Sequence, residues 1–316
     1  MSEIKFIEVK SEIAAGTRGA SLGIDALKIA SIDLGSSFFR NYSAVEVKTI
    51  NDILFTETNT PKAKYIEQVF EVENNVCQEV AIAMENGNFP FILAGDHSTA
   101  AGTIAGIKKV NNDKRIGVIW IDAHADLHTP YTTPSGNMHG MPLAMVAAID
   151  NLENKINNPT KTTISYWNKL KTIGGKGAKI ELEDVVFVAA RDLESPELSL
   201  LKKHNIRNFE TEELREKGVK FVADEAIKKL ANCDIIYVSF DVDSMDSEIS
   251  MGTGTPVPGG LTVKEAIELN SLLVSNKKVC AWEIVEVNPT LDTENLMAEN
   301  ALKVMESVRE VLEARL

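Results

Sequence analysis

Acidic and imidazole side chains gather where three apolar segments of the chain end. Segments 89–93, 116–121 and 235–240 are rich in Val, Ile and Phe, and each leads into Asp or His. The candidate ligands are His97 after the first segment, Asp122, His124 and Asp126 after the second, and Asp241 and Asp243 after the third. Carboxylate and imidazole groups together suit divalent manganese, iron or cobalt. The spacing therefore predicts a metal site where these segments end.

The number of candidate ligands indicates two ions rather than one. Four of the six are carboxylates, which would repel each other strongly if they lay together without cations. Two divalent ions bridged by carboxylates remove that repulsion and leave room for a shared hydroxide. A single Asp after a strand is more often a turn former or a helix cap. Three strand ends carrying the same residue types favour the metal interpretation.

The histidines support this interpretation. Of the five in the chain, four lie between residues 97 and 139, namely His97, His124, His128 and His139. The fifth, His204, lies in a polar stretch and is expected at the surface. Residues 128–142 form a loop dense in hydroxyl groups, glycine and proline. Such a loop commonly carries function on a rigid scaffold, although its composition also fits a polar connector.

The segments that position these residues indicate an α/β fold. Further apolar runs occur at 185–190 and 279–285, and helical spacing occurs at 61–85, 223–232, 263–273 and 295–316. Nearly continuous apolar runs that alternate with helices are typical of strands buried on both faces of a parallel sheet. Ligands of such sheets bind at the carboxyl ends of the strands. We expect one domain over 1–316, with a surface insertion around 151–179 whose Tyr166 and Trp167 pack partly inside.

The composition restricts the partners and the compartment. The chain has 316 residues and a formal net charge of -13, and a long basic stretch for nucleic acid is lacking. No apolar run approaches the eighteen or so residues of a membrane span, and the start resembles no signal peptide. Cys77, Cys233 and Cys280 form no metal-binding spacing, and we expect the last two to be buried. We predict a cytoplasmic protein without nucleic-acid or membrane partners.

Five motifs, taken together, resemble the arginase branch of the ureohydrolase family. They are GTRGASLG at 16–23, LAGDHS at 93–98, DAHADLHTPYTTPSGNMHGMP at 122–142, SFDVDSMDSEISMGTGTPVPGGLT at 239–262 and EVNP at 286–289. The resemblance runs in order along nearly the whole chain. It implies a three-layer α/β/α sandwich around a central parallel sheet, and a homo-oligomer, either a trimer or a hexamer. It also implies a pair of manganese ions, and the ligands equally accommodate cobalt or iron.

The resemblance assigns roles to individual residues. One ion would be held by His97, Asp122, Asp126 and Asp241, and the other by Asp122, His124, Asp241 and Asp243. A hydroxide supplied by the metal pair would attack the guanidinium carbon of L-arginine and yield L-ornithine and urea. Asp126 would relay the proton to the leaving amine, His139 would exchange protons with solvent, and Glu286 would pair with the guanidinium group.

The family pattern also suggests how the amino-acid end of the substrate is bound. His128, Thr133, Ser135 and Asn137 match positions that bind the α-carboxylate. Glu194 and Glu197 match positions that bind the α-amino group, and Thr255 is a further substrate-binding position. A substrate lacking the carboxylate would leave donors unpaired, which is costly in a buried site.

Several residues depart from the family pattern and keep two alternatives open. His128 stands where the family usually has Asn, and Glu194 where it usually has the shorter Asp. Ser247 replaces a proline, and Met251-Gly252 replaces a proline-containing approach to the TGTP segment. The alternatives are another ureohydrolase, such as an agmatinase or a guanidinobutyrase, and a non-catalytic metal-binding homologue. The complete ligand set argues against the second.

Overall fold

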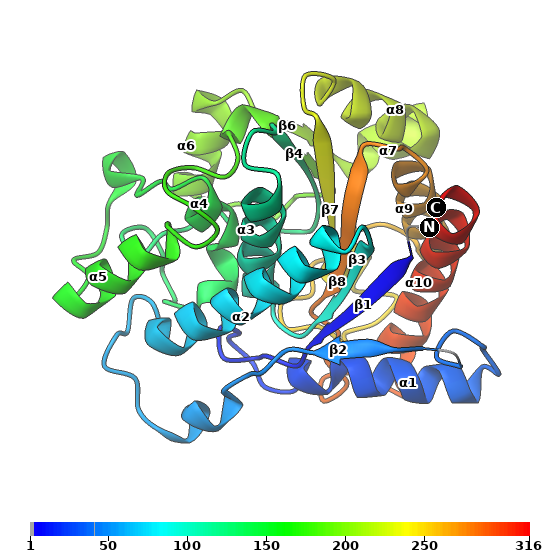
Figure 1. The fold of residues 1–316 in the computed structure, drawn as a ribbon, viewed down its shortest axis with the longest axis horizontal. Helices are drawn as coiled ribbons and strands as arrows, with labels where there is room; N and C mark the ends of the chain where they lie inside the picture. The colour runs from blue at the N-terminus through cyan, green and yellow to red at the C-terminus, as the bar shows by residue number, and fades with distance from the viewer. Residues whose placement is uncertain (1–2, 41) are drawn as a thin grey trace.

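The computed structural model of the chain describes residues 3–40 and 42–316. In these residues, eight parallel strands form one sheet in the order β2-β1-β3-β8-β7-β4-β5-β6 (Figure 1). The strands are β1 (Ile4–Val9), β2 (Ala44–Glu46), β3 (Phe89–Ala94), β4 (Ile116–Ile121), β5 (Val185–Val188), β6 (Arg207–Phe209), β7 (Ile235–Asp241) and β8 (Val279–Val285). The four central strands are almost entirely buried, as their continuous apolar sequences predict.

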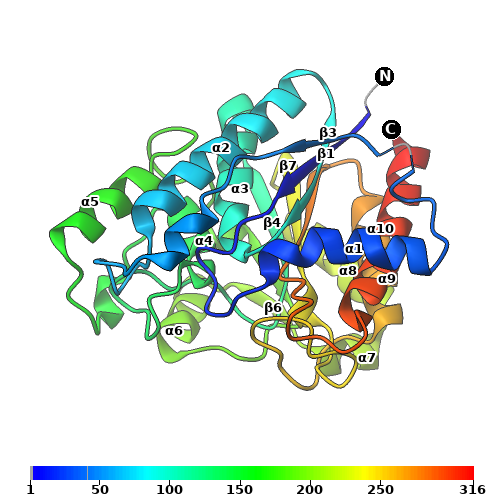
Figure 2. The same cartoon turned by 90° about the horizontal axis from the view of Figure 1, so that it is seen from below.

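Helices cover both faces of the sheet. Successive strand residues point to opposite faces, so that Val118 and Trp120 belong to one hydrophobic cluster and Ile119 and Ile121 to the other. The first cluster is covered by α2 (Ile66–Glu85), α3 (Ala100–Val110), α4 (Pro142–Val146), α5 (Lys161–Leu170) and α6 (Ser195–Lys203). The second is covered by α1 (Gly23–Asp33), α7 (Thr211–Lys217), α8 (Val219–Lys229), α9 (Val263–Val274) and α10 (Leu296–Arg315). Figure 2 shows the two helical layers on either side of the sheet, which confirms the predicted three-layer fold.

The two strands nearest the middle of the sheet come late in the sequence. β8 and β7 lie between β3 and β4, so that the carboxyl ends of β3, β8, β7 and β4 are neighbours. Trp120 of β4 pairs with Ser239 of β7, which in turn pairs with Glu283 of β8. This order brings together loops that are far apart along the chain.

The elements differ from the sequence-based prediction mainly at their ends. β5 ends at Val188 because Ala189 adopts a left-handed conformation with φ of 70°. α2 begins at Ile66 rather than at residue 61, because the backbone N–H of Lys64 donates instead to the carbonyl of Gly136 at 2.9 Å. α8 begins and ends a few residues earlier than predicted, after Gly218 at φ of 90°.

The structure also shows how far two cysteines and the aromatic residues of α5 are buried. Cys233 is buried as predicted, whereas Cys280 is only half-buried. Trp167 packs into the core, and Tyr166 lies half-buried on the same helix. Within residues 3–40 and 42–316, no helix is both long and apolar enough to span a membrane.

Candidate active site

The buried imidazole of His97 faces three carboxylates. His97 lies on a short 3-10 turn directly after β3. Its Nδ1 is 3.0 Å from Asp122 Oδ2, 3.1 Å from Asp126 Oδ2 and 3.1 Å from Asp241 Oδ2. The three carboxylates come from the ends of β4 and β7. The predicted meeting of these strand ends is therefore present in the fold.

A second group forms around His124. Its Nδ1 lies 3.0 Å from Asp243 Oδ2 and 3.4 Å from Asp122 Oδ1, and its Nε2 lies 3.8 Å from Asp192. The possible ligand atoms of His97, Asp122 and Asp241 all lie within 4.8 Å of one another, as do those of Asp122, His124 and Asp243. Asp122 belongs to both groups, whereas Asp241 belongs to the first only. Asp126 faces His97 from outside both groups.

The chemistry of these groups fits a pair of divalent cations. His97 Nδ1 and Asp122 Oδ2 are fully buried and form no hydrogen bond with any other described residue, although they lie 3.0 Å apart. Buried polar atoms without partners are costly. Atoms that converge in this way without hydrogen-bond alignment are arranged as ligands of a common ion, and nitrogen with carboxylate oxygen is a suitable donor set.

The electrostatics of the protein without bound ions lead to the same conclusion. Burial and the charge of Asp122 raise the pKa of Asp126 to about 7. Burial, together with neighbouring carboxylates, also raises the pKa values of Asp241 and Asp243. Burial lowers the pKa of His97, but the contacts with three carboxylates raise it by more than burial lowers it, so that the net shift is upward. The site thus holds excess negative charge that protons or cations must neutralise.

The ring of His97 is held from two other sides. Its Nε2 lies 2.8 Å from Ser239 Oγ, and the ring stacks on Trp120 with centroids 4.1 Å apart and planes 5° from parallel. A hydrogen bond at the second ring nitrogen commonly orients a metal-binding histidine. Ser239 was not among the predicted residues. Its signal in the sequence was its position two residues before Asp241, on the same face of β7.

His139 and Glu286 form a hydrogen-bonded pair beside the metal-facing residues. Glu286 Oε1 lies 3.0 Å from His139 Nδ1 and accepts a hydrogen bond from the backbone N–H of His97 at 3.0 Å. Burial lowers the pKa of His139, but Glu286 outweighs it and the pKa is raised to about 9. Burial raises the pKa of Glu286, and His139 reverses this so that the net shift is downward.

Two of the predicted catalytic residues have left-handed backbone conformations. Asp126 has φ of 51° and Glu286 has φ of 68°. Side chains other than glycine rarely adopt this conformation, and it costs on the order of 1–3 kcal/mol unless the surroundings enforce it. Such strain is concentrated at functional sites, which agrees with the roles expected for both carboxylates.

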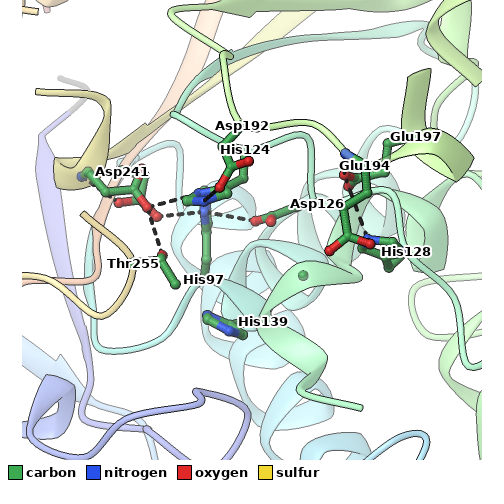
Figure 3. Close-up of a pocket in the computed structure, with 12 residues that line it drawn as sticks. His97, His124, Asp126, His128, His139, Asp192, Glu194, Glu197, Asp241 and Thr255 are labelled. Carbon is green, nitrogen blue, oxygen red and sulfur yellow. Dashed lines mark hydrogen bonds and ion pairs between the residues drawn. The ribbon is translucent and has the colours of Figure 1, made fainter. Parts of the chain in front are cut away.

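A pocket opens beside the two ligand groups. The described residues that line it are His97, His124, Asp126, His128, His139, Gly140, Asp192, Glu194, Glu197, Asp241, Asp243 and Thr255. Figure 3 shows the metal-facing residues at one end and His128, Glu194 and Glu197 at the other. Thr255 donates to Asp243 Oδ2 at 3.1 Å. Asp192 and Gly140 were not among the predicted residues.

The far end of the pocket carries two glutamates and an imidazole. Glu194 and Glu197 form a capping box at the start of α6. Burial raises the pKa of Glu197 to about 7, although its carboxylate accepts from the backbone N–H groups of Leu127 and Glu194. His128 Nε2 lies 3.4 Å from Glu194 Oε2 and 3.7 Å from Glu197 Oε2. Burial lowers the pKa of His128.

The other residues expected to bind the α-carboxylate do not line the pocket. Thr133 is buried, and its hydroxyl accepts from the backbone N–H of Gly136 at 2.9 Å. Ser135 is exposed, and its hydroxyl accepts from the backbone N–H of Asn137. Asn137 Oδ1 accepts from Lys64 Nζ at 2.8 Å. Lys64 was not among the predicted residues, and it does not line the pocket either.

Segment 150–157 supports the loop that carries these residues. The side-chain amide of Asn157 donates to the carbonyl of Thr133 at 2.6 Å and of Pro130 at 3.3 Å. The indole N–H of Trp167 donates to Asp150 Oδ1 at 2.8 Å, which ties the segment to α5. The region expected to be a surface insertion therefore contacts the loop beside the pocket.

Known proteins share both the sequence pattern and the fold. A model of the Arginase family matches residues 2–309. An arginase of Brevibacillus brevis is 36% identical over 309 residues, which is 96% of this chain and 97% of that protein. The crystal structure of arginase from Bacillus cereus has a TM-score of 0.80 at 32% identity, and 98% of each chain is covered. The crystal structure of Entamoeba histolytica arginase in complex with L-ornithine has a TM-score of 0.82 at 28% identity, covering 98% of this chain and 99% of that one.

Proposed function

This chain belongs to the arginase family, and we propose on that basis that it hydrolyses L-arginine to L-ornithine and urea with two bound divalent metal ions. The observation that carries the proposal is the pair of ligand groups that share Asp122 at one end of a pocket. The other end of the same pocket carries Glu194 and Glu197, which suit the α-ammonium group of an amino acid.

The residues of the site divide the chemistry between them. When bound, a pair of divalent cations lowers the pKa of water and supplies hydroxide at neutral pH. Asp126 Oδ2 borders the pocket beside His97 and is placed to take up a proton and deliver it to the leaving amine. His139 lies at the pocket wall, partly open to solvent, and its contact with Glu286 raises its pKa, which favours the protonated form that can donate a proton.

The pocket orients the substrate along its length. We place the guanidinium group at the metal end, where Asp126 lines the pocket beside the ligand groups that would hold the hydroxide-supplying ions. Two backbone N–H groups already hold the Glu197 side chain in place. Binding the α-ammonium group therefore costs little additional side-chain entropy. His128 lies at the start of the loop and next to Glu194, and we assign it as the hydrogen-bond donor for the α-carboxylate.

We propose manganese as the metal because four of the six ligands are carboxylates and the others are imidazoles. Protein stripped of metal and reloaded with manganese, cobalt or iron tests this assignment. Manganese should restore the fastest urea release at equal occupancy. A clear preference for cobalt or iron would overturn the assignment without affecting the proposed reaction.

Substrate comparison tests the reaction itself. Manganese-loaded protein should release urea from L-arginine at least tenfold faster than from agmatine or 4-guanidinobutyrate, measured as kcat/KM. Both of these compounds keep the guanidinium group, but agmatine lacks the carboxylate and guanidinobutyrate lacks the ammonium group. A preference for either compound would assign the chain to a different ureohydrolase activity. Release of urea from none of them would favour a non-catalytic homologue.

We extend the proposal to a homo-oligomer, a trimer or a hexamer, in the cytoplasm. Multi-angle light scattering on the metal-loaded protein tests the assembly, with a mass of one chain as the contradicting result. Fractionation of the source cells tests the compartment.

A further inference from the structure

Arg191 follows β5 and places its guanidinium group among backbone carbonyls of two loops, its own and the one that joins β7 to α9. Each of its three nitrogens donates. The acceptors are the carbonyl oxygens of Ala189, Asp243, Ser244, Met245, Val257 and Pro258, at 2.8 to 3.3 Å. Within the described residues the guanidinium group forms no ion pair with a carboxylate within 4.0 Å. A guanidinium group that is more than half buried and donates only to backbone carbonyls holds the segments that carry those carbonyls in a fixed conformation.

The backbone of Arg191 contacts a different loop from its side chain. Its N–H donates to the carbonyl of Ala123 at 2.9 Å, between Asp122 and His124. Its Nη2 donates to the carbonyl of Asp243 at 2.9 Å. Arg191 therefore joins the two loops that carry the ligand group Asp122, His124 and Asp243. In the group around His97, Asp241 is the last residue of β7 and pairs there with Val285 of β8, and His97 follows β3, so strands of the sheet position both residues.

The loop that follows the third ligand segment is shaped to receive this side chain. Gly260 lies so close to Arg191 that a Cβ atom there would come within 2.6 Å of Nη2. The acceptors on Asp243, Met245 and Val257 share this one nitrogen. A planar fork with five N–H donors can satisfy carbonyls in several directions at once, whereas a lysine has three donors on a single atom.

We infer that Arg191 is the positioning residue for the ligand group Asp122, His124 and Asp243, and that the group around His97 does not depend on it. The inference rests on the proposed function only in requiring that the protein bind two divalent ions.

Calorimetric titration of the metal-stripped protein with manganese chloride tests this inference. The unmodified chain should bind two equivalents. Arg191→Met should keep one equivalent at its original affinity and weaken the other at least tenfold, because the loops lose the bonds that fix Asp243 relative to His124. Arg191→Lys retains the charge and three donors, so it should fall between the two.

Arg315 offers a matched control. It is also about half buried and donates only to carbonyls, those of Val274 and Asn276 at 2.6 Å and of Val279 at 3.0 Å. These acceptors lie around the start of β8, away from the ligand groups. Arg315→Met should lower the melting temperature and leave both manganese equivalents unchanged.

The outcomes separate the inference from the proposed function. If Arg191→Met binds both equivalents as the unmodified chain does, or loses both equally, the inference is wrong and the proposed function stands. If the unmodified chain binds neither manganese nor cobalt nor iron, the proposed function itself fails and the inference fails with it. Should Arg191→Met not fold, Arg191→Lys decides by the same criterion, since equal affinities at both positions would contradict the inference.

Discussion

Asp126 combines three properties that single it out among the acidic residues. It lies 3.1 Å from the imidazole of His97, it borders the pocket, and its backbone is left-handed. In the protein without bound ions, burial and the charge of Asp122 raise the pKa of this carboxyl group to about 7. A carboxylate at this position, beside the ligand groups and open to the pocket, can take a proton from one group and pass it to another.

Replacing Asp126 by asparagine should reduce urea release at least about a hundredfold, because the amide can neither carry the proton nor bind an ion as a charged ligand. The folded state should persist, since the substitution removes one buried negative charge from a crowded group. Urea release and circular dichroism measure the two effects. Asp113→Asn, at an exposed position after α3, is the control and should change neither; activity of Asp126→Asn close to that control would exclude the proposed role.

The His139–Glu286 pair gives a dependence of stability on pH in the metal-free protein. The pKa of His139 is about 9 in the folded protein and near 6.5 when unfolded. The stabilisation is therefore complete below pH 6.5 and is lost as the pH rises towards 9, at roughly 1.4 kcal/mol for each pH unit in that interval. Denaturant unfolding at pH 6.5, 8 and 9.5 should show the gap between the unmodified chain and His139→Asn closing as the pH rises. A gap that stays constant or widens would contradict the assignment.

The metal-facing residues could be predicted because Asp and His are themselves the residue types that bind divalent metal ions. Six Asp and His side chains after three apolar strands are more than turns and helix caps require, and the fold brings them together. Ser239 and Arg191 could not be identified in the same way. Ser239 resembles any small residue in a strand, and the partners of Arg191 are backbone carbonyls, which every residue has.

The segment that joins α4 to β5 supports the pocket through hydrogen bonds rather than by lining it. Asn157 holds the carbonyls of Pro130 and Thr133, and Trp167 anchors the segment to the core. Pro130 and Thr133 in the loop from His128 to Asn137 thus depend on a residue that lies 27 and 24 positions further along the chain.

Asn157→Ala should raise the KM for L-arginine severalfold, with a smaller effect on kcat, because the loop beside His128 loses two hydrogen bonds worth about 1 kcal/mol each. Steady-state kinetics and thermal unfolding measure the change. Asn154→Ala is the control, since the Asn154 amide contacts Asn151 and Ser199 instead of the loop. Equal KM values for the two variants would show that the support is not specific.

The sequence predicted the central strands better than the edge strands. Continuous apolar runs identify β3, β4, β7 and β8, because both faces of these strands are covered. β2 and β6 have three residues each, too few for a recognisable pattern, and β1 includes Lys5 and Glu8. The start of α2 depends on a contact with Gly136 that is distant in sequence, and local helical spacing carries no information about it.

The cluster of buried aspartates should make the thermal stability of the protein depend on bound metal. Asp122, Asp126, Asp241 and Asp243 are all buried at one edge of the sheet, and two divalent cations would balance their charge. Removing metal with a chelator should lower the melting temperature by several degrees, and added manganese should restore it. A ligand that binds only the folded state at a hundred times its Kd contributes about 2.7 kcal/mol. Differential scanning calorimetry with and without chelator measures the effect, and an unchanged melting temperature would contradict metal binding in the folded state.

The order of strands also determines when the chain can acquire its chemistry. β7 and β8 fill the space between β3 and β4, yet they are among the last strands to leave the ribosome. Until residues 235–285 have emerged, the earlier strands cannot complete one sheet, and two inner edges stay open to pairing with other chains. His97 and Asp122 meet only after that space is filled. A chain interrupted before β7 is thus both inactive and prone to aggregate, and newly made protein becomes able to hold its ions only after residues 235–285 have been made.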